Sequence, residues 1–228
     1  TKCVLLTGIV ADQSTLRLWK TVRDAKNLGT KLIVIDPRRT AAAEIADIWL
    51  QIRPTTNAAL LLAMLNVIIE ERLYDKEFVK KWCYGFDDLA KRVKEYPPEK
   101  MAEVTWIPAG KIRKAARMFA THKPAMGAHG MGHEHHRDTA SADRARFILM
   151  AITGNIDIEG GEYIPGPPRC IPEAALEGRE YMPEGQRQKQ IGLDRFRVVS
   201  HPFYNELQKN SARVWGKDKP WGLGRTNY

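Results

Sequence analysis

Cysteine is scarce in this sequence: Cys3, Cys83 and Cys170 are the three in 228 residues, and no two form a C-x-x-C pair. This spacing excludes a disulfide framework and a zinc knuckle. Long apolar segments are also missing. The longest run, residues 58–69, is shorter than the roughly 20 residues that a helix needs to cross a bilayer. We therefore expect no direct membrane insertion.

No signal-peptide pattern is visible either, because the sequence opens at Thr1 directly on an apolar, strand-like stretch. A chain without an initiator methionine that starts inside a strand is expected to be a piece of a longer protein. The sequence therefore leaves the export signal and the compartment open. A bacterial or archaeal cytoplasm or periplasm is the range considered.

Acidic residues are outnumbered, with 27 Asp and Glu against 36 Lys and Arg, so the formal net charge is +9. This balance favours anionic partners such as phosphates, nucleotides, nucleic acid or an acidic subunit. The simpler alternative is a surface that lysines keep soluble. We expect no nucleic acid as partner, because no known nucleic-acid-binding motif or interleaving of aromatic and basic residues is present.

Apolar runs of strand length alternate with longer segments of helical periodicity. We expect strands at 2–8, 31–36, 47–54 and 124–132, and helices at 14–29, 57–73, 75–86, 107–124 and 139–155. Ser14 is the expected N-cap of the first helix, with Leu18, Val22, Ala25 and Leu28 on its apolar face. The predicted fold class is α/β, a Rossmann-like parallel sheet with helices on both faces.

Beyond residue 160 the composition changes. Seven of the thirteen prolines fall in 161–228, and the periodicity is lost. We expect residues 1–160 to form the α/β domain. We expect residues 161–228 to be an extended, Pro- and Gly-rich segment that packs on the rest of a larger protein.

Three stretches follow predicted strands, where α/β folds bind ligands. In "TGIVADQS" (7–14), Gly8 permits close backbone approach and Ser14 is available to a phosphate, but G-x-G-x-x-G is lacking. In "DPRRT" (36–40), Asp36 is an acceptor for ribose hydroxyls or for a guanine N–H edge, and Arg38 and Arg39 add positive charge for a diphosphate. An ordinary turn is the alternative for each.

The third stretch, "HGMGHEHHRDT" (129–139), holds four histidines within eight residues. Zinc is disfavoured, because the loop has no H-E-x-x-H helix and no cysteine partner nearby. A hydrogen-bonding loop around a polar ligand is favoured, since Gly130 and Gly132 allow the backbone to come close. No metal ligand is assigned, and Cys83 is interpreted as a core residue.

The segments "LIVIDPRRTAAAEIADIWLQIRPTTNAALLLAMLNVIIEERLYDKEFVKKWCYGF", "IRKAARMFA" and "AITGNIDIEGGEY" follow one another in the order typical of one family. The sequence resembles the molybdopterin oxidoreductases over about residues 2–163. The resemblance implies molybdopterin guanine dinucleotide with molybdenum or tungsten as cofactor. The cofactor-binding residues implied by the three stretches and the polar triplet at 55–57 are Gly8, Ala11, Ser14, Asp36, Arg38, Arg39, Thr55, Thr56, Asn57, Met131, Gly132 and His135.

The same resemblance implies that the iron–sulfur motif and the metal-ligating residue precede this region. A 4Fe-4S cluster is thus expected in the full-length protein and not in this chain, and no catalytic residue is assigned. The expected partners are the remaining domains of the same subunit and an iron–sulfur electron-transfer subunit. By itself the chain is expected to be inactive.

Three features depart from the family pattern. Val10 and Ala11 replace the usual Asn-Pro, Asn57 replaces an aspartate, and the stretch after Gly161 argues against formate as substrate. A non-redox hydratase of the same family and a stand-alone nucleotide-binding module remain as alternatives.

Overall fold

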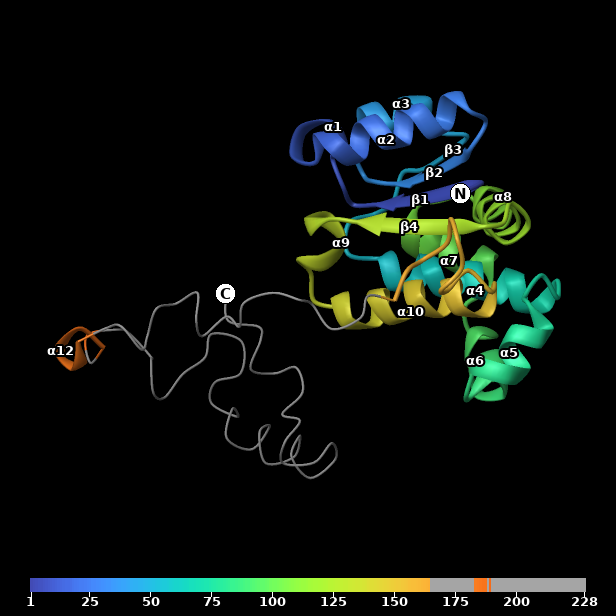
Figure 1. Cartoon of the computed structure of the whole chain (residues 1–228). Helices are drawn as coiled ribbons and strands as arrows, with labels where there is room; N and C mark the ends of the chain where they lie inside the picture. The colour runs from blue at the N-terminus through green and yellow to red at the C-terminus, as the bar shows by residue number, and fades with distance from the viewer. Residues whose placement is uncertain (165–182, 188, 190–228) are drawn as a thin grey trace. The chain divides into compact units, whose positions relative to one another are not determined.

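A computed structural model describes residues 1–164, 183–187 and 189 of the chain. A four-stranded sheet lies at the centre of the first part (Figure 1). Its strands are β1 (Cys3–Thr7), β2 (Lys31–Ile35), β3 (Ile48–Leu50) and β4 (Ala125–His129). The spatial order is β3-β2-β1-β4, and every neighbouring pair is parallel. The predicted parallel α/β fold is confirmed.

The register brings the carboxyl ends of the strands together. Thr7, the last residue of β1, pairs with Ile35 on one side and His129 on the other. Ile35 in turn pairs with Leu50 at the end of β3. The turns that follow the strands therefore start from one edge of the sheet, where α/β proteins bind ligands.

Helices cover both faces of the sheet (Figure 1). Alternate residues of β1 and β2 point to opposite sides. Leu6 and Val34 belong to a small apolar cluster with Val22 of α2. Leu5 and Ile33 belong to a larger one built mainly from α4, α8 and α10. The helices of this part are α1 (Ala11–Ser14), α2 (Leu16–Asn27), α3 (Ala41–Ile45), α4 (Asn57–Glu70), α5 (Lys76–Trp82), α6 (Phe86–Val93), α7 (Pro98–Thr105), α8 (Ala109–Thr121), α9 (Met131–Glu134) and α10 (Thr139–Ile152).

The first predicted helix differs from the observed one. Ser14 does not cap it: it is the last residue of α1, and its hydroxyl donates to the carbonyl of Val10 at 2.9 Å. This backward hydrogen bond keeps the hydroxyl away from the α2 amides. Leu28 is 89% exposed, because α2 ends at Asn27 and Leu28 is its C-cap. The prediction of an apolar face that includes Leu28 was wrong.

Elements were also missed where the pattern was short. The helices α3, α6 and α7 have only five to eight residues each, too few for a clear period of 3.6. The predicted strand at 47–54 is reduced to the three residues Ile48–Leu50, because only these pair with β2.

The first compact unit of the chain comprises Thr1–Ile164. From the Pro- and Gly-rich part, residues 161–164, 183–187 and 189 are described, with one helical turn, α12 (Glu184–Arg187). The prediction that 161–228 is extended falls largely outside the described residues, and the domain boundary after 160 stays a prediction. Among the described helices, none has both the length and the apolar character needed to cross a membrane.

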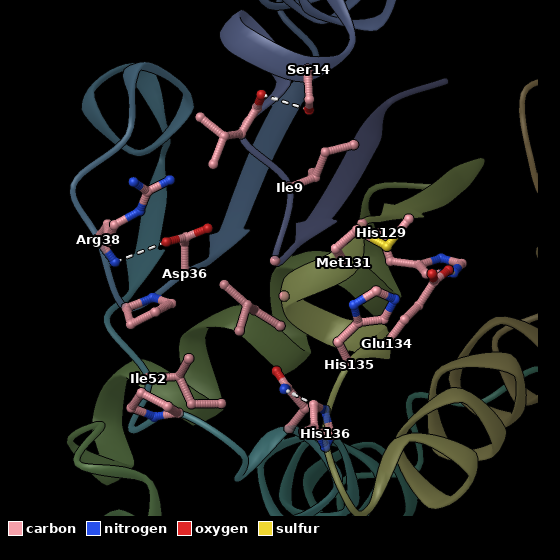
Figure 2. A pocket seen from close by; sticks show the side chains of 18 of the residues that line it. Ile9, Ser14, Asp36, Arg38, Ile52, His129, Met131, Glu134, His135 and His136 are labelled. Atoms are coloured by element: carbon pink, nitrogen blue, oxygen red, sulfur yellow. Dashed lines mark hydrogen bonds and ion pairs between the residues drawn. The ribbon is translucent and has the colours of Figure 1, made fainter.

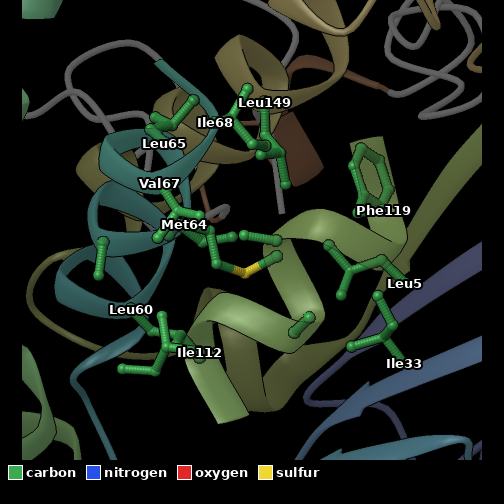
Figure 3. Packing of buried hydrophobic residues seen from close by; sticks show 14 of the residues in the cluster. Leu5, Ile33, Leu60, Met64, Leu65, Val67, Ile68, Ile112, Phe119 and Leu149 are labelled. Carbon is green, nitrogen blue, oxygen red and sulfur yellow. The ribbon is translucent and has the colours of Figure 1, made fainter. Parts of the chain in front are cut away.

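We predict that Phe119→Ala strongly destabilises the 228-residue chain. Phe119 is a residue of α8 and is fully buried in the cluster that also contains Leu5 and Ile33 (Figure 3). Truncating a buried Phe costs about 3–5 kcal/mol of unfolding free energy. Urea denaturation followed by circular dichroism measures the change. Leu28→Ala serves as control, because its exposed side chain should contribute less than about 0.5 kcal/mol. Equal losses in both variants would contradict this packing.

Candidate functional site

A cavity of about 790 Å³ opens where β1, β2 and β4 end (Figure 2). Nine of the predicted site residues line it: Gly8, Ser14, Asp36, Arg38, Thr55, Asn57, Met131, Gly132 and His135. These residues come from four separate segments of the chain. The parallel register brings the segments after β1, β2 and β4 together, and the turn before α4 adds the fourth.

Gly8 joins the loops after β1 and β4. Its φ of +57° lies in the left-handed region, and a Cβ there would meet the backbone nitrogen of His133 at 2.5 Å and the carbonyl carbon of Gly132 at 2.6 Å. The amide of Gly132 donates to the carbonyl of Gly8 at 3.0 Å. The two loops therefore pack backbone against backbone, which only glycine permits at this position.

Asp36 follows directly after β2 and is 4% exposed. One carboxylate oxygen accepts a hydrogen bond from the amide of Arg38 at 2.8 Å. The other points toward the cavity and has no hydrogen-bond partner within the described residues (Figure 2). Burial raises the pKa of this carboxyl, although the Arg38 amide and guanidinium oppose the rise. Such a buried, half-satisfied acceptor is suited to a ligand that brings N–H or O–H donors.

The two arginines of "DPRRT" have different surroundings. Arg38 lines the cavity, and no carboxylate forms an ion pair with it within the described residues. Arg39 is not among the lining residues, and its Nε lies 3.7 Å from Glu44 Oε1 on the surface. Thr40 caps α3 by accepting from the amide of Ala43. The positive charge available to a ligand here is therefore that of Arg38.

The polar triplet at 55–57, where α4 begins, likewise has residues inside and outside the cavity lining. Thr55 lines the cavity with a φ of +71°, an outlying conformation for a β-branched residue. Asn57 is 4% exposed, and its Nδ2 lies 3.1 Å from Nε2 of His136. Thr56 is outside the lining and donates to the carbonyl of Arg53 at 2.8 Å. Backbone strain next to a cavity is a feature of ligand-binding sites.

The histidines have several different environments. His129 Nε2 lies 2.8 Å from Glu134 Oε1 at the cavity wall. His133 is fully buried, 3.3 Å from Asp143 Oδ1, and burial lowers its pKa. His135 and Met131 both line the cavity. No cluster of three or more His, Cys, Asp or Glu side chains placed for a metal ion occurs within the described residues.

Ala11 is fully buried and outside the cavity lining. Sequence reasoning also left out polar lining residues, above all Gln13, Glu134 and His136. Gln13 precedes Ser14 in the first predicted stretch, while Glu134 and His136 belong to the histidine-rich one. Their membership of those stretches was the available signal. Which side chains of each loop face the cavity depends on the backbone path.

Cys3 is fully buried in β1, and burial raises the pKa of its thiol to about 12. A thiol of that pKa stays protonated at neutral pH and is a poor metal ligand. Cys83 packs partly buried against the larger cluster, as the core interpretation predicted. Cys170 lies outside the described residues.

The fold and the strand-end cavity define a parallel α/β domain of the kind that binds ligands at its strand ends. Comparison with known proteins gives its family. The family model of the molybdopterin oxidoreductases matches residues 4–194. The chain therefore belongs to the molybdopterin oxidoreductase family, and the predicted resemblance is confirmed.

The similar proteins are named for different activities. Acetylene hydratase of Syntrophotalea acetylenica is 42% identical over 94% of this chain and 30% of its own length. The F420-dependent formate dehydrogenase subunit alpha of Methanocaldococcus jannaschii is 39% identical over 69% of the chain and 24% of its own. The solved structure of acetylene hydratase from Pelobacter acetylenicus superposes with a TM-score of 0.73 at 42% identity, covering 94% of this chain and 30% of that one. The chain spans less than a third of each of these relatives.

We predict that Gly8→Ala destabilises the chain and displaces the loop after β4. The added Cβ would collide with backbone atoms, which cannot rotate away as a side chain does. Gly29→Ala is the matched control, because Gly29 also has a positive φ (+94°) but nothing lies within 4 Å of its added Cβ. Thermal unfolding should show a larger fall for Gly8→Ala, and amide exchange at 130–135 should speed up in that variant alone. Equal effects would mean that the two loops are not in contact.

Proposed function

We propose that this chain is the part of a molybdenum- or tungsten-dependent enzyme that binds one pterin guanine dinucleotide in the strand-end cavity. The observation that supports this proposal is the buried carboxylate of Asp36 at the cavity wall, of which only one oxygen accepts a hydrogen bond. In this proposal its unpartnered oxygen accepts hydrogen bonds from the guanosine part, either from ribose hydroxyls or from the N–H edge of the base.

The residues of the cavity fit such a ligand. Gly8 and Gly132 both line the cavity and have no side chains, so backbone groups face the cavity there. Arg38 supplies an unpaired positive charge for the diphosphate. Asn57 Nδ2 and His136 Nε2 lie 3.1 Å apart and form a polar pair at the cavity wall. Met131 is 63% exposed beside His135, which suits a flat ring system such as a pterin.

The roles of the chain's own residues then follow. Asp36 fixes the position of the guanosine, Arg38 balances the phosphates, and the loop at 131–135 orients the pterin end. The bound metal cofactor supplies the reaction chemistry, while this chain contributes binding and orientation. We further propose that the rest of the subunit supplies the metal-ligating residue and a 4Fe-4S cluster, and that residues 161–228 pack on that rest.

Two reaction classes are candidates for the whole enzyme. Redox chemistry corresponds to the name of the family and to relatives such as the formate dehydrogenase. A non-redox hydratase is favoured by a different observation, since acetylene hydratase matches 94% of the chain and the formate dehydrogenase 69%. Catalytic turnover of the complete enzyme that consumes neither an electron donor nor an electron acceptor would identify a hydratase. Stoichiometric consumption of a donor or an acceptor would identify an oxidoreductase.

We predict that Asp36→Asn weakens binding of guanosine diphosphate, a soluble stand-in for one end of the cofactor. The variant keeps one acceptor oxygen but presents an amide donor to the ligand's own donors. The cost is about 1–3 kcal/mol, or roughly a five- to 150-fold rise in Kd. Calorimetry with the 228-residue chain measures it. Inosine diphosphate, which lacks the 2-amino group, and 2′-deoxyguanosine diphosphate separate base from ribose recognition.

The stability of the ligand-free variant provides the control. Because burial raises the pKa of Asp36, the charged form is disfavoured in the fold, and this cost is present above the raised pKa. Asp36→Asn removes the charge, so its unfolding midpoint at pH 7 should equal or exceed that of the unaltered chain. Binding by the unaltered chain should weaken as pH falls through the raised pKa. Unchanged affinity in the Asn variant would exclude Asp36 from guanosine recognition.

A further inference from the structure

A second cavity, of about 380 Å³, lies next to the first. The two share three lining residues, Pro37, Ile52 and Pro54. The other residues that line it are Gln51, Trp106, Ile107, Pro108 and Lys111. No acidic side chain is among them. Its walls are thus prolines, isoleucines, one glutamine and one tryptophan, with a positive charge from Lys111. The five residues outside the shared wall have no role in the nucleotide contacts described so far.

Trp106 has an unusual backbone conformation. It follows α7 with a φ of +64°, in the left-handed region that bulky residues rarely adopt. Its side chain is 66% exposed, so it contributes little to the core in return. Strain of this kind, held next to a cavity, is typical of positions that contact a ligand.

Two cations flank this tryptophan. The guanidinium carbon of Arg53 lies 5.3 Å from the centre of the Trp106 ring, and the Arg53 amide donates to the carbonyl of Thr105 at 2.8 Å. Lys111 lines the cavity from the first turn of α8. Neither cation has a carboxylate within ion-pair distance among the described residues. A flat aromatic surface beside two uncompensated positive charges is complementary to a planar, anionic ligand.

Trp82 shows that this combination is not a general property of the surface. It is 67% exposed, and Lys81 Nζ lies 4.9 Å from the centre of its ring. However, Trp82 is the last residue of the helix α5, with ordinary backbone dihedrals, and it lines neither cavity. Exposure and a neighbouring cation are therefore shared by both tryptophans, whereas the cavity and the strained backbone belong to Trp106.

We propose that the second cavity is a stacking subsite for a planar heteroaromatic ring that carries an anionic group. Trp106 is the platform, and Lys111 provides a counter-charge from the cavity wall. Arg53 is outside the lining and provides a second positive charge beside the Trp106 ring. The identity of the ring rests on the proposed function: it is the base of the nucleotide held at Asp36. This base reaches Trp106 across the shared wall at Pro37. The base then lies on Trp106, and Asp36 accepts from the ribose hydroxyls.

The test uses the 228-residue chain, with guanosine diphosphate and 2-naphthoate as probes in calorimetric titrations. The second probe is a planar anion without sugar or diphosphate, so it reports on the subsite independently of Asp36. Trp106→Leu should raise the Kd of both probes by about five- to 150-fold, the usual loss when one stacking partner is removed. Trp106→Phe, which keeps a ring, should restore most of the affinity. Trp82→Leu, the matched control, should change neither.

Thermal unfolding separates a binding role from a structural one. Trp106→Gly suits the left-handed backbone, so the ligand-free variant should unfold at the same or a higher temperature than the unaltered chain while losing both probes. A lower unfolding temperature would make Trp106 a structural residue and overturn the subsite.

The outcomes for the subsite and for the proposed function differ. Naphthoate binding that depends on Trp106, without any binding of guanosine diphosphate, would leave the subsite standing and remove the proposed function. Binding of guanosine diphosphate that depends on Asp36 but not on Trp106 would do the reverse. Failure of both probes to bind the unaltered chain would overturn the subsite.

Discussion

The close backbone contact between Gly8 and Gly132 sets the geometry of the cavity. It joins the turn after β1 to the loop after β4, two segments more than 120 residues apart in the sequence, through a 3.0 Å hydrogen bond. Because no side chain stands between them, the loop at 131–135 is held against the turn after β1. A wider separation would move the histidine-rich loop away from the carboxylate that it faces across the cavity.

The two apolar clusters make this contact possible. The larger one packs α4, α8 and α10 against one face of the sheet, and the smaller one packs α2 and α3 against the other. Together they fix the strand register that places Thr7, Ile35 and His129 side by side. The site is thus a set of loops on a rigid core, an arrangement that lets polar and strained residues accumulate where stability does not depend on them.

Strained and half-satisfied groups occur at both of the neighbouring cavities. Thr55 and Trp106 have positive φ, and Asp36 holds a buried carboxylate with one unpartnered oxygen. Each of these is unfavourable in the isolated chain. A ligand with hydrogen-bond donors, a diphosphate and a flat ring would satisfy the unpartnered oxygen of Asp36 and contact Thr55 and Trp106. This is why we interpret both cavities as parts of one extended binding region.

The sequence by itself determined the fold class and the edge of the sheet at which the site lies. Buried apolar runs alternating with long amphipathic segments require a parallel sheet covered by helices, and parallel strands place their following loops together. The tertiary structure alone decided which side chains enter the cavity. Arg38 and Asn57 line it, whereas Arg39, Thr56 and Ala11 do not. It also paired Trp106 with Arg53, because side-chain direction depends on local backbone dihedrals and on contacts between distant segments, which sequence spacing does not encode.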